Sequence, residues 1–186
     1  METLVIGKYR LPDTSKPSEN RVKMVWEWLL LYKGGGRALL LSRDVIDWEF
    51  FSGVSTLPGP GLSEAWETSY LREYLNGEVF NEGFTEKEKG DILTNESGDR
   101  LFLLTAEEAR KYLPEKEYRK GEILFYEDFD GDQTVFRDWI PWWLNTEGED
   151  DFAMQVMEPD GEINERGLSN DSDEIGVRPA MWIRWP

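Results

Sequence analysis

Hydrophobic and polar positions alternate most regularly between residues 24 and 32. Every second side chain there is large and apolar, and on the two-residue period of a β-strand these side chains share one face: Met24, Trp26, Trp28, Leu30 and Tyr32. Three consecutive glycines follow, and a second apolar run occupies residues 38–41. Because glycine accepts the backbone angles of a tight turn, we predict that the two runs form a β-hairpin.

The C-terminal end of the chain is apolar, with Val177, Met181, Trp182 and Ile183 close together. Terminal residues gain little from becoming ordered unless they pack against another part of the protein. We therefore predict a buried closing strand at 177–184. Its expected partner is a short N-terminal strand at 4–10.

The middle of the chain has helical patterns. Leu71 and Leu75 fall on one face of a predicted helix at 69–77, for which Asn76 and Gly77 supply a stop signal. Two capping boxes, Thr85 to Glu88 and Thr105 to Glu108, each open a further helix, and the second helix is expected to end before Pro114. The apolar run 101–104 is predicted to be a buried strand that leads into this last helix.

Beyond Gly121 the pattern becomes irregular and rich in aromatic residues, with strand-like pieces at 139–144 and 152–157 and a turn at 158–161. The fold class we expect is α+β: small antiparallel sheets, two or three short helices in the middle of the chain, and paired N- and C-terminal strands. One domain over residues 1–186 is expected from the length. The chain has neither an apolar run long enough to cross a bilayer nor a secretory leader, so we expect a cytoplasmic protein.

Composition removes several classes of chemistry. There is no cysteine and no histidine, which excludes disulfides, thiolate nucleophiles, cysteine-bound metals and histidine acid–base catalysis. The formal net charge of −17 argues against a nucleic-acid partner. Residues 145–175 contain one base, Arg166, and eleven acids: Glu147, Glu149, Asp150, Asp151, Glu158, Asp160, Glu162, Glu165, Asp171, Asp173 and Glu174. This region is either a solvated face or a surface for a cation or a basic partner.

Eight segments in order along the chain carry a family resemblance: Ile6–Tyr9, Trp26–Leu30, Ala38–Ser42, Trp66–Gly77, Phe84–Glu88, Phe102–Ala109, Trp142–Leu144 and Gly176–Ile183. Together they resemble a bacterial family of domains of unknown function, DUF6273. The glycine hairpin, the Trp-Trp-Leu segment and the Gly-Val-Arg-Pro-Ala ending are also similar to C-type-lectin-fold domains. That wider group includes the formylglycine-generating enzymes and the variable proteins of diversity-generating retroelements.

The resemblance implies a lectin-like scaffold in which the first and last strands pair, and it supplies no activity to carry over. Formylglycine-generating relatives use cysteine-bound metal, so their activity is excluded in this cysteine-free chain. After Trp142–Leu144 the family tends to have a basic residue and a Ser-Pro-Gly turn. This chain has Asn145–Asp151 instead, so a role of that loop in relatives does not transfer.

The function we expect is non-enzymatic binding of a partner through acidic, aromatic-rich loops between residues 121 and 172, because loops on a rigid sheet commonly carry recognition. The partner, a protein or a glycan, is expected to be basic if it meets the acidic surface, and no membrane partner is expected. The candidate binding residues are Trp142, Trp143, Glu147, Glu149, Asp150 and Asp151.

Calcium is a possible cofactor. Asp128, Asp130 and Asp132 alternate as the ligands of a calcium loop do, although the sixth and twelfth positions, Gln133 and Trp139, do not fit an EF-hand. A polar turn is the competing interpretation of these aspartates. A calcium-assisted glycan binder, using Glu158–Asp160 and Asn170–Asp171, is the first alternative function.

A carboxylate-dependent hydrolase is the second alternative function, since a pair of the many acids could act as acid and base. No catalytic residue can be assigned from the sequence. Arg178 is expected to be a strand residue paired with a carboxylate rather than a catalytic group.

Overall fold

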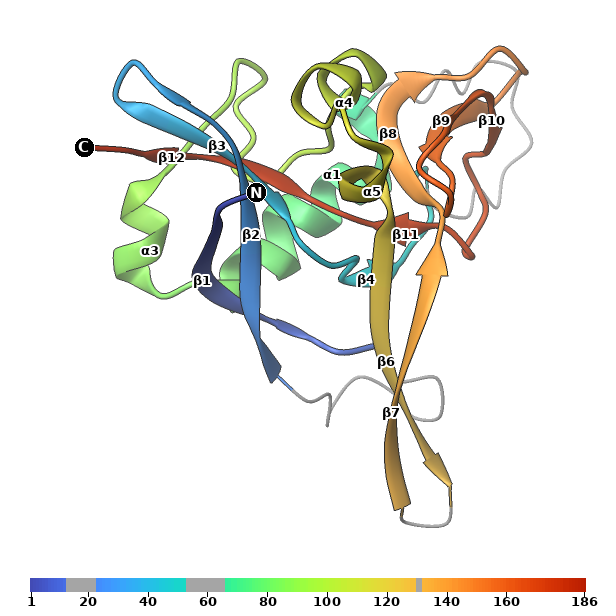
Figure 1. Cartoon of the computed structure of the whole chain (residues 1–186), viewed down its shortest axis with the longest axis horizontal. Coiled ribbons are helices and arrows are strands. Elements are labelled where there is room, and N and C mark those ends of the chain that lie inside the picture. The colour runs from blue at the N-terminus through green and yellow to red at the C-terminus, as the bar shows by residue number, and fades with distance from the viewer. Residues whose placement is uncertain (13–22, 53–65, 130–131) are drawn as a thin grey trace.

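Two five-stranded sheets and a separate two-stranded hairpin make up most of the protein (Figure 1). The computed structural model describes residues 1–12, 23–52, 66–129 and 132–186, without the side chains of 126–129 and 132–133. The first sheet is antiparallel throughout, and its strands in spatial order are β1 (Thr3–Arg10), β2 (Lys23–Gly34), β3 (Arg37–Ser42), β12 (Ala180–Arg184) and β5 (Ile92–Leu93).

The predicted glycine hairpin is confirmed. Strands β2 and β3 pair up to Gly34 and Arg37, so a two-residue turn joins them. Gly35 and Gly36 fill this turn with φ angles of 60° and 74°, which only glycine adopts without strain. Two positive φ angles in succession are the geometry whose twist matches that of the flanking strands.

The predicted pairing of the two terminal strands is wrong. Strands β1 and β12 belong to one sheet, but β2 and β3 lie between them. Residues Ala38–Leu41 of β3 are 0% exposed, which is typical of a central strand with a neighbour on each side. In β1 the side chain of Val5 is 63% exposed, as suits an edge strand.

The second sheet has the spatial order β10 (Ile163–Ser169), β9 (Ala153–Met157), β8 (Trp142–Glu147), β11 (Gly176–Val177) and β4 (Asp47–Trp48). Its strands are antiparallel except for β8 and β11, which run parallel. The turn expected at 158–161 is confirmed and joins β9 to β10. Only Arg178 and Pro179 separate β11 from β12, so the chain passes between the two sheets at this point.

Strands β6 (Gly121–Phe129) and β7 (Asp132–Ile140) form a long hairpin that projects away from both sheets (Figure 1). The expectation of irregular loops from 121 to 172 is therefore wrong for most of that region, which consists of β6–β10. A projecting hairpin is wet on much of its surface, so its strands lack the strict apolar alternation by which half-buried strands are found. Val135 and Trp139 of β7 are 57% and 49% exposed.

Helical structure extends further than predicted. It runs without a break from α1 (Tyr70–Tyr74) through a π-helical turn (Leu75–Val79) to α2 (Phe80–Gly83). The predicted stop fails because the amide of Asn76 is used elsewhere. It donates to the carbonyl of Arg72 one turn earlier in the helix, and in tertiary contacts it donates to the carbonyl of Leu101 and accepts from the N–H groups of Arg100 and Leu101.

Both predicted capping boxes are confirmed. Thr85 and Glu88 open α3 (Glu86–Asp91), and Thr105 and Glu108 open α4 (Ala106–Tyr112), in each case with reciprocal hydrogen bonds. Leu113 caps the end of α4, directly before the proline. Short helices complete the set of described elements: a 3-10 turn (Trp66–Thr68) and α5 (Lys116–Arg119).

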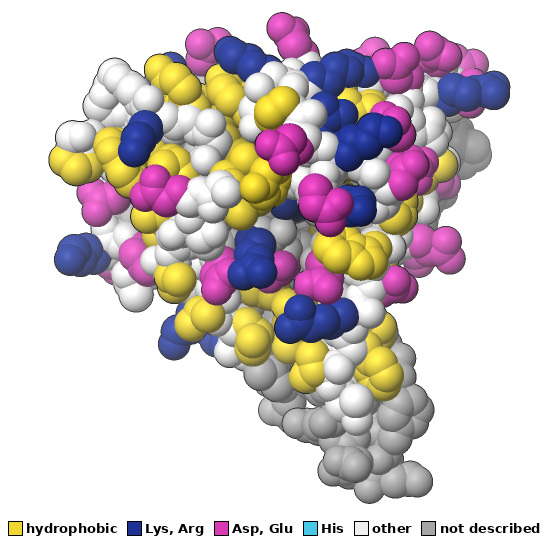
Figure 2. Space-filling view, viewed as in Figure 1, with side chains coloured by type: hydrophobic (Ala, Val, Ile, Leu, Met, Phe, Trp, Pro, Cys, Tyr) yellow, Lys and Arg dark blue, Asp and Glu magenta, His cyan; other side chains and the backbone are white. Residues whose placement is uncertain are grey.

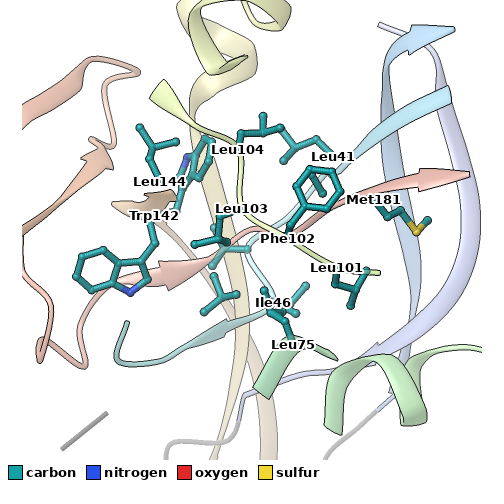
Figure 3. Packing of buried hydrophobic residues seen from close by; sticks show 14 of the residues in the cluster. Leu41, Ile46, Leu75, Leu101, Phe102, Leu103, Leu104, Trp142, Leu144 and Met181 are labelled. Atoms are coloured by element: carbon teal, nitrogen blue, oxygen red, sulfur yellow. The ribbon is translucent and has the colours of Figure 1, made fainter. Parts of the chain in front are cut away.

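One hydrophobic core joins these elements, and side chains from both sheets and from the helices meet in it (Figure 3). The segment 101–104 lies in its centre with exposures between 0% and 5%. It is not the strand that was predicted, because it makes a single bridge, from Phe102 to Ala180. An apolar run of four residues indicates burial but does not specify a hydrogen-bonding partner.

Candidate functional site

The two tryptophans predicted to contact a partner are buried instead. Trp142 and Trp143 are both 0% exposed and belong to the core. Their indole N–H groups donate to the carbonyls of Arg119 and Glu49, each at 2.8 Å. Because successive side chains of a strand point to opposite faces and both rings are 0% exposed, both faces of β8 are covered here. The prediction that these rings bind a partner is therefore wrong, and they position the segment that follows them.

That segment, residues 147–152, carries the four predicted acidic residues and is named here the acidic loop. Glu147, Glu149, Asp150 and Asp151 are all exposed. Asp150 lies 3.7 Å from Arg166, whereas the other three carboxylates make no ion pair within the described residues. Figure 2 shows acidic side chains along the edge of the molecule that β9 and β10 occupy, with basic side chains among them.

Main-chain hydrogen bonds fix the acidic loop against β9 and β10. The N–H of Gly148 donates to Ala153 at 2.8 Å, and those of Glu149 and Asp150 donate to Glu165 and Arg166. A Cβ at Gly148 would lie 2.4 Å from the carbonyl oxygen of Arg166, so only glycine fits there. The loop is therefore held in one shape by its neighbours.

Phe152 ends the acidic loop, and sequence reasoning did not select it. Its side chain is 60% exposed and its φ is 60°, the one positive φ at a non-glycine residue in the described part of the chain. The left-handed conformation costs a non-glycine residue about 1–2 kcal/mol. Its carbonyl accepts from the N–H of Asn170 at 2.9 Å, which holds it in place. No residue type in the sequence signals this backbone, because tertiary hydrogen bonds impose it.

Of the predicted metal ligands, Asp128 and Asp132 lie at the end of the β6–β7 hairpin, and Asp130 is outside the described residues. On the backbone, Asp128 pairs with Gln133 and Phe129 with Asp132. The three carboxylates fall outside the described side chains, so the calcium loop stays a prediction. Among the side chains that are described, no three acids gather closely enough to hold a metal ion.

The segment Glu158–Asp160 forms a turn whose carboxylates are used locally. Glu158 accepts from the amide of Asn164 at 2.9 Å, and Asp160 accepts from the N–H of Glu162 at 3.0 Å. Gly161, with φ at 85°, closes the turn. The downstream residue Asn170 is 8% exposed. These contacts give the segment a turn role, and the glycan-binding use of its carboxylates stays a prediction.

The side chain of Arg178 fixes the short segment that connects β11 of the second sheet to β12 of the first. It is 1% exposed and donates to five main-chain carbonyls at 2.9–3.2 Å, those of Ser42, Arg43, Tyr118, Arg119 and Lys120. The prediction of a strand residue is wrong, because Arg178 lies between β11 and β12, and carbonyls rather than a carboxylate accept its hydrogen bonds, although the charge of Asp44 acts on it. Burial lowers the pKa of Arg178 to about 10, which still leaves it charged at neutral pH, and its guanidinium lies 5.1 Å from the ring of Trp142.

The carboxyl group of Asp44 has a raised pKa. Burial is the main cause, and the nearby carboxylates of Glu122 and Glu27 add to it while Arg43 opposes it. Asp44 and Glu122 line a cleft of about 340 Å³ beside Trp139. A raised carboxyl pKa in a cleft is a property of general acids, so this is the feature that the hydrolase alternative would use.

Comparisons with known proteins identify a family. A model of a domain of unknown function, DUF6273, matches residues 35–185. Neither a curated protein nor a solved structure matches the chain. In the described residues, no helix is long and apolar enough to cross a membrane. The first strand inside the matched segment is β3, and it pairs with the last strand, β12. Since the match covers most of its length, the chain belongs to the DUF6273 family.

Proposed function

We propose that the protein is a non-enzymatic interaction module that recognises a basic protein partner through the acidic loop. The observation that carries this proposal is Phe152, an aromatic side chain 60% exposed on a strained and hydrogen-bonded backbone. Strain of this kind persists only where surrounding structure imposes it, and it is concentrated at functional positions. Nothing in the packing of the core requires phenylalanine at this exposed position.

The chemistry of the loop fits a binding hot spot. Binding energy at interfaces is concentrated in a few aromatic or arginine side chains, with polar residues around them. Here Glu149, Asp150 and Asp151 directly precede Phe152. A partner that offers an apolar pocket with lysine or arginine at its rim would complement both features. Rim charges mainly raise the association rate and are screened by salt, so binding should weaken as the ionic strength rises.

The scaffold we propose is C-type-lectin-like. Two observations support it: the first and last strands of the family segment pair as β3 and β12, and the Trp-Trp-Leu segment lies in the core. In such a scaffold the sheets are rigid, and the connections between strands vary and carry recognition.

The test compares the wild type with Phe152→Gly in affinity capture from a lysate of the source organism at low and high salt. Glycine accepts a positive φ without strain, so this variant should fold at least as stably as the wild type. The control is Val5→Ser, which removes another exposed apolar side chain, on the edge strand β1.

We expect one set of basic proteins to be captured at low salt by the wild type and by Val5→Ser, and to be lost with Phe152→Gly or at high salt. Identical captured sets from all three proteins would contradict the proposal. Capture that survives high salt would contradict the role given to the acidic residues.

A further inference from the structure

A second concave surface lies away from the acidic loop, between the segment that follows β5, the start of α4 and strands β3 and β12. Its volume is about 500 Å³, within the range of small-ligand sites. We name it the Trp182 groove, and the residues that line it are Arg37, Trp66, Thr94, Asn95, Glu96, Ser97, Phe102, Leu103, Thr105, Glu108, Asn145 and Trp182.

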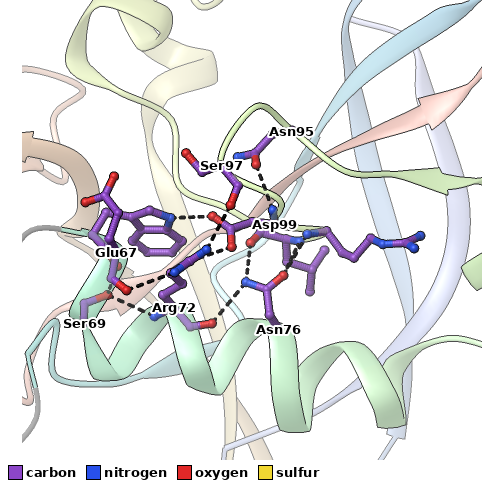
Figure 4. A network of polar contacts seen from close by, with 10 residues as sticks. Glu67, Ser69, Arg72, Asn76, Asn95, Ser97 and Asp99 are labelled. Atoms are coloured by element: carbon purple, nitrogen blue, oxygen red, sulfur yellow. Dashed lines mark hydrogen bonds and ion pairs between the residues drawn. The ribbon is translucent and has the colours of Figure 1, made fainter.

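A buried polar network makes one wall of the Trp182 groove rigid (Figure 4). Asp99 is 3% exposed and accepts from the indole N–H of Trp66 at 2.7 Å and from Nε of Arg72 at 2.6 Å. Arg72 also donates to the carbonyls of Glu67 and Ser97, and Asn95 accepts from the N–H of Asp99. Segment 94–99 is thus fixed to α1, which pre-organises the groove.

Arg37 is the feature of this groove that points to a ligand. Among the arginines that the structure describes, it alone has a side chain with neither a hydrogen bond nor an ion pair to the described residues. Its guanidinium lies 4.3 Å from the ring centroid of Trp182, which orients it. In a chain with 38 acids and 21 basic residues, an exposed arginine whose guanidinium donors are used by no described residue can take an added acceptor in place of water.

A second positive charge lies close to Arg37. Arg184 lies directly opposite Arg37 across the β3–β12 pair, and its own partner, Asp91, is 3.7 Å away. Like charges directly opposite each other are unfavourable in a sheet. An anion bound by Arg37 would relieve this repulsion.

Other residues of the groove have polar side-chain atoms that form no hydrogen bond with a described residue. The side chains of Thr94, Glu96 and Asn145, the hydroxyl of Ser97 and the amide nitrogen of Asn95 are all without a hydrogen bond to the described residues. Asparagine amides carry a donor and an acceptor and match the peptide group. The carboxylates of Glu96 and Glu108 favour a cationic group nearby.

We propose that the Trp182 groove binds the C-terminal end of a peptide, with Arg37 holding the terminal carboxylate. The planar guanidinium fork matches a carboxylate in a bidentate arrangement. The asparagine amides pair with the peptide main chain, and Glu96 and Glu108 select a lysine or arginine upstream. A peptide fits better than a polyanion, because a net charge of −17 repels multiple negative charges but tolerates one carboxylate accompanied by basic side chains.

The experiment titrates the protein with a library of short N-acetylated peptides that carry a free C-terminal carboxylate and one lysine or arginine, and with the same library as C-terminal amides. Binding is followed by isothermal calorimetry. The variant is Arg37→Gln, and the matched control is Arg137→Gln, which removes the same charge from an exposed arginine on β7, outside the groove. Melting temperatures establish that both variants fold.

We expect members of the free-carboxylate library to bind, and amidation and Arg37→Gln each to weaken that binding by about tenfold or more, since both remove a charge-assisted pair. Arg137→Gln should leave the affinity within about threefold. Equal binding of amides and acids, insensitivity to Arg37→Gln, or an equal loss with Arg137→Gln would overturn the proposal. So would a failure of every library member to bind, or binding of a uronic-acid oligosaccharide in place of the peptides.

Discussion

Replacing Arg178 with methionine should destabilise the fold strongly. The guanidinium is 1% exposed and donates to five main-chain carbonyls: two at the end of β3 and three at the end of α5. Methionine fills a similar volume but donates no hydrogen bond. Because the acceptors are backbone groups, no compensating substitution can remove them.

The size of the expected loss in stability depends on the main-chain carbonyls that are left without a hydrogen-bond donor. A buried acceptor left without a partner costs about 1–3 kcal/mol, but Tyr118 and Lys120 line the 340 Å³ cleft, where water can reach their carbonyls. Removing the buried charge also returns part of its desolvation penalty. The net loss we expect for Arg178→Met is about 3–5 kcal/mol, a large part of the 5–15 kcal/mol that usually stabilises a domain. Arg178→Lys has at most three donors and should lose about 2–4 kcal/mol.

Urea unfolding followed by tryptophan fluorescence measures this loss directly, since Trp142 lies 5.1 Å from Arg178. Arg184→Met is the control, because its ion pair with Asp91 is exposed and should be worth at most about 1 kcal/mol. A loss below about 1 kcal/mol for Arg178→Met would refute the reasoning, and so would equal losses for the lysine and methionine variants.

Two further changes test local geometry. Gly7→Ala should lose about 2–5 kcal/mol, because φ is 76° and a Cβ would lie 2.6 Å from the carbonyl oxygen of Gly83, whereas Gly77→Ala meets no atom within 4 Å and should gain about 0.5–1 kcal/mol. Thermal unfolding would measure both changes in stability, and equal shifts in melting temperature for the two variants would contradict these predictions. Burial raises the pKa of Glu88, but hydrogen bonds from Thr85 and Gly7 outweigh it, so the folded-state pKa is lowered. Its stabilisation should be complete above the ordinary value of 4.5 and disappear as the pH falls through the folded-state pKa. Glu88→Gln should therefore flatten the acid limb of the stability curve, and an unchanged limb would be evidence against this role.

The sequence predicted the features that short segments determine by themselves. Each capping box depends on four consecutive residues, and the β2–β3 turn depends on Gly35 and Gly36, so these were confirmed. The apolar run 38–41 also indicated burial correctly. It did not identify the neighbouring strands, because burial on both faces is compatible with several strand orders. Strand order and the length of the helix beyond Asn76 depend on contacts between distant residues.

The same distinction between local and tertiary features applies to the candidate binding residues. The exposed acids of residues 147–151 were predicted from composition, whereas Trp142 and Trp143 turned out to fill the core. Phe152 and Arg37 were missed for a common reason. What distinguishes them is a tertiary property, a left-handed backbone in one case and the absence of a described polar partner in the other. Neither property has a counterpart in residue type or spacing.

Strands β1 and β2 lie outside the segment that the family model matches, yet the matched segment depends on them in this chain. Trp26 stacks on Phe84 at 5.3 Å and donates to the hydroxyl of Ser42, and the N–H of Gly7 donates to Glu88 at 2.9 Å. Without β2, one edge of β3 would be unpaired along residues that are now 0% exposed, a surface prone to aggregation. The structural unit that presents the acidic loop and the Trp182 groove is therefore larger than residues 35–185, and a protein for binding experiments has to include both strands.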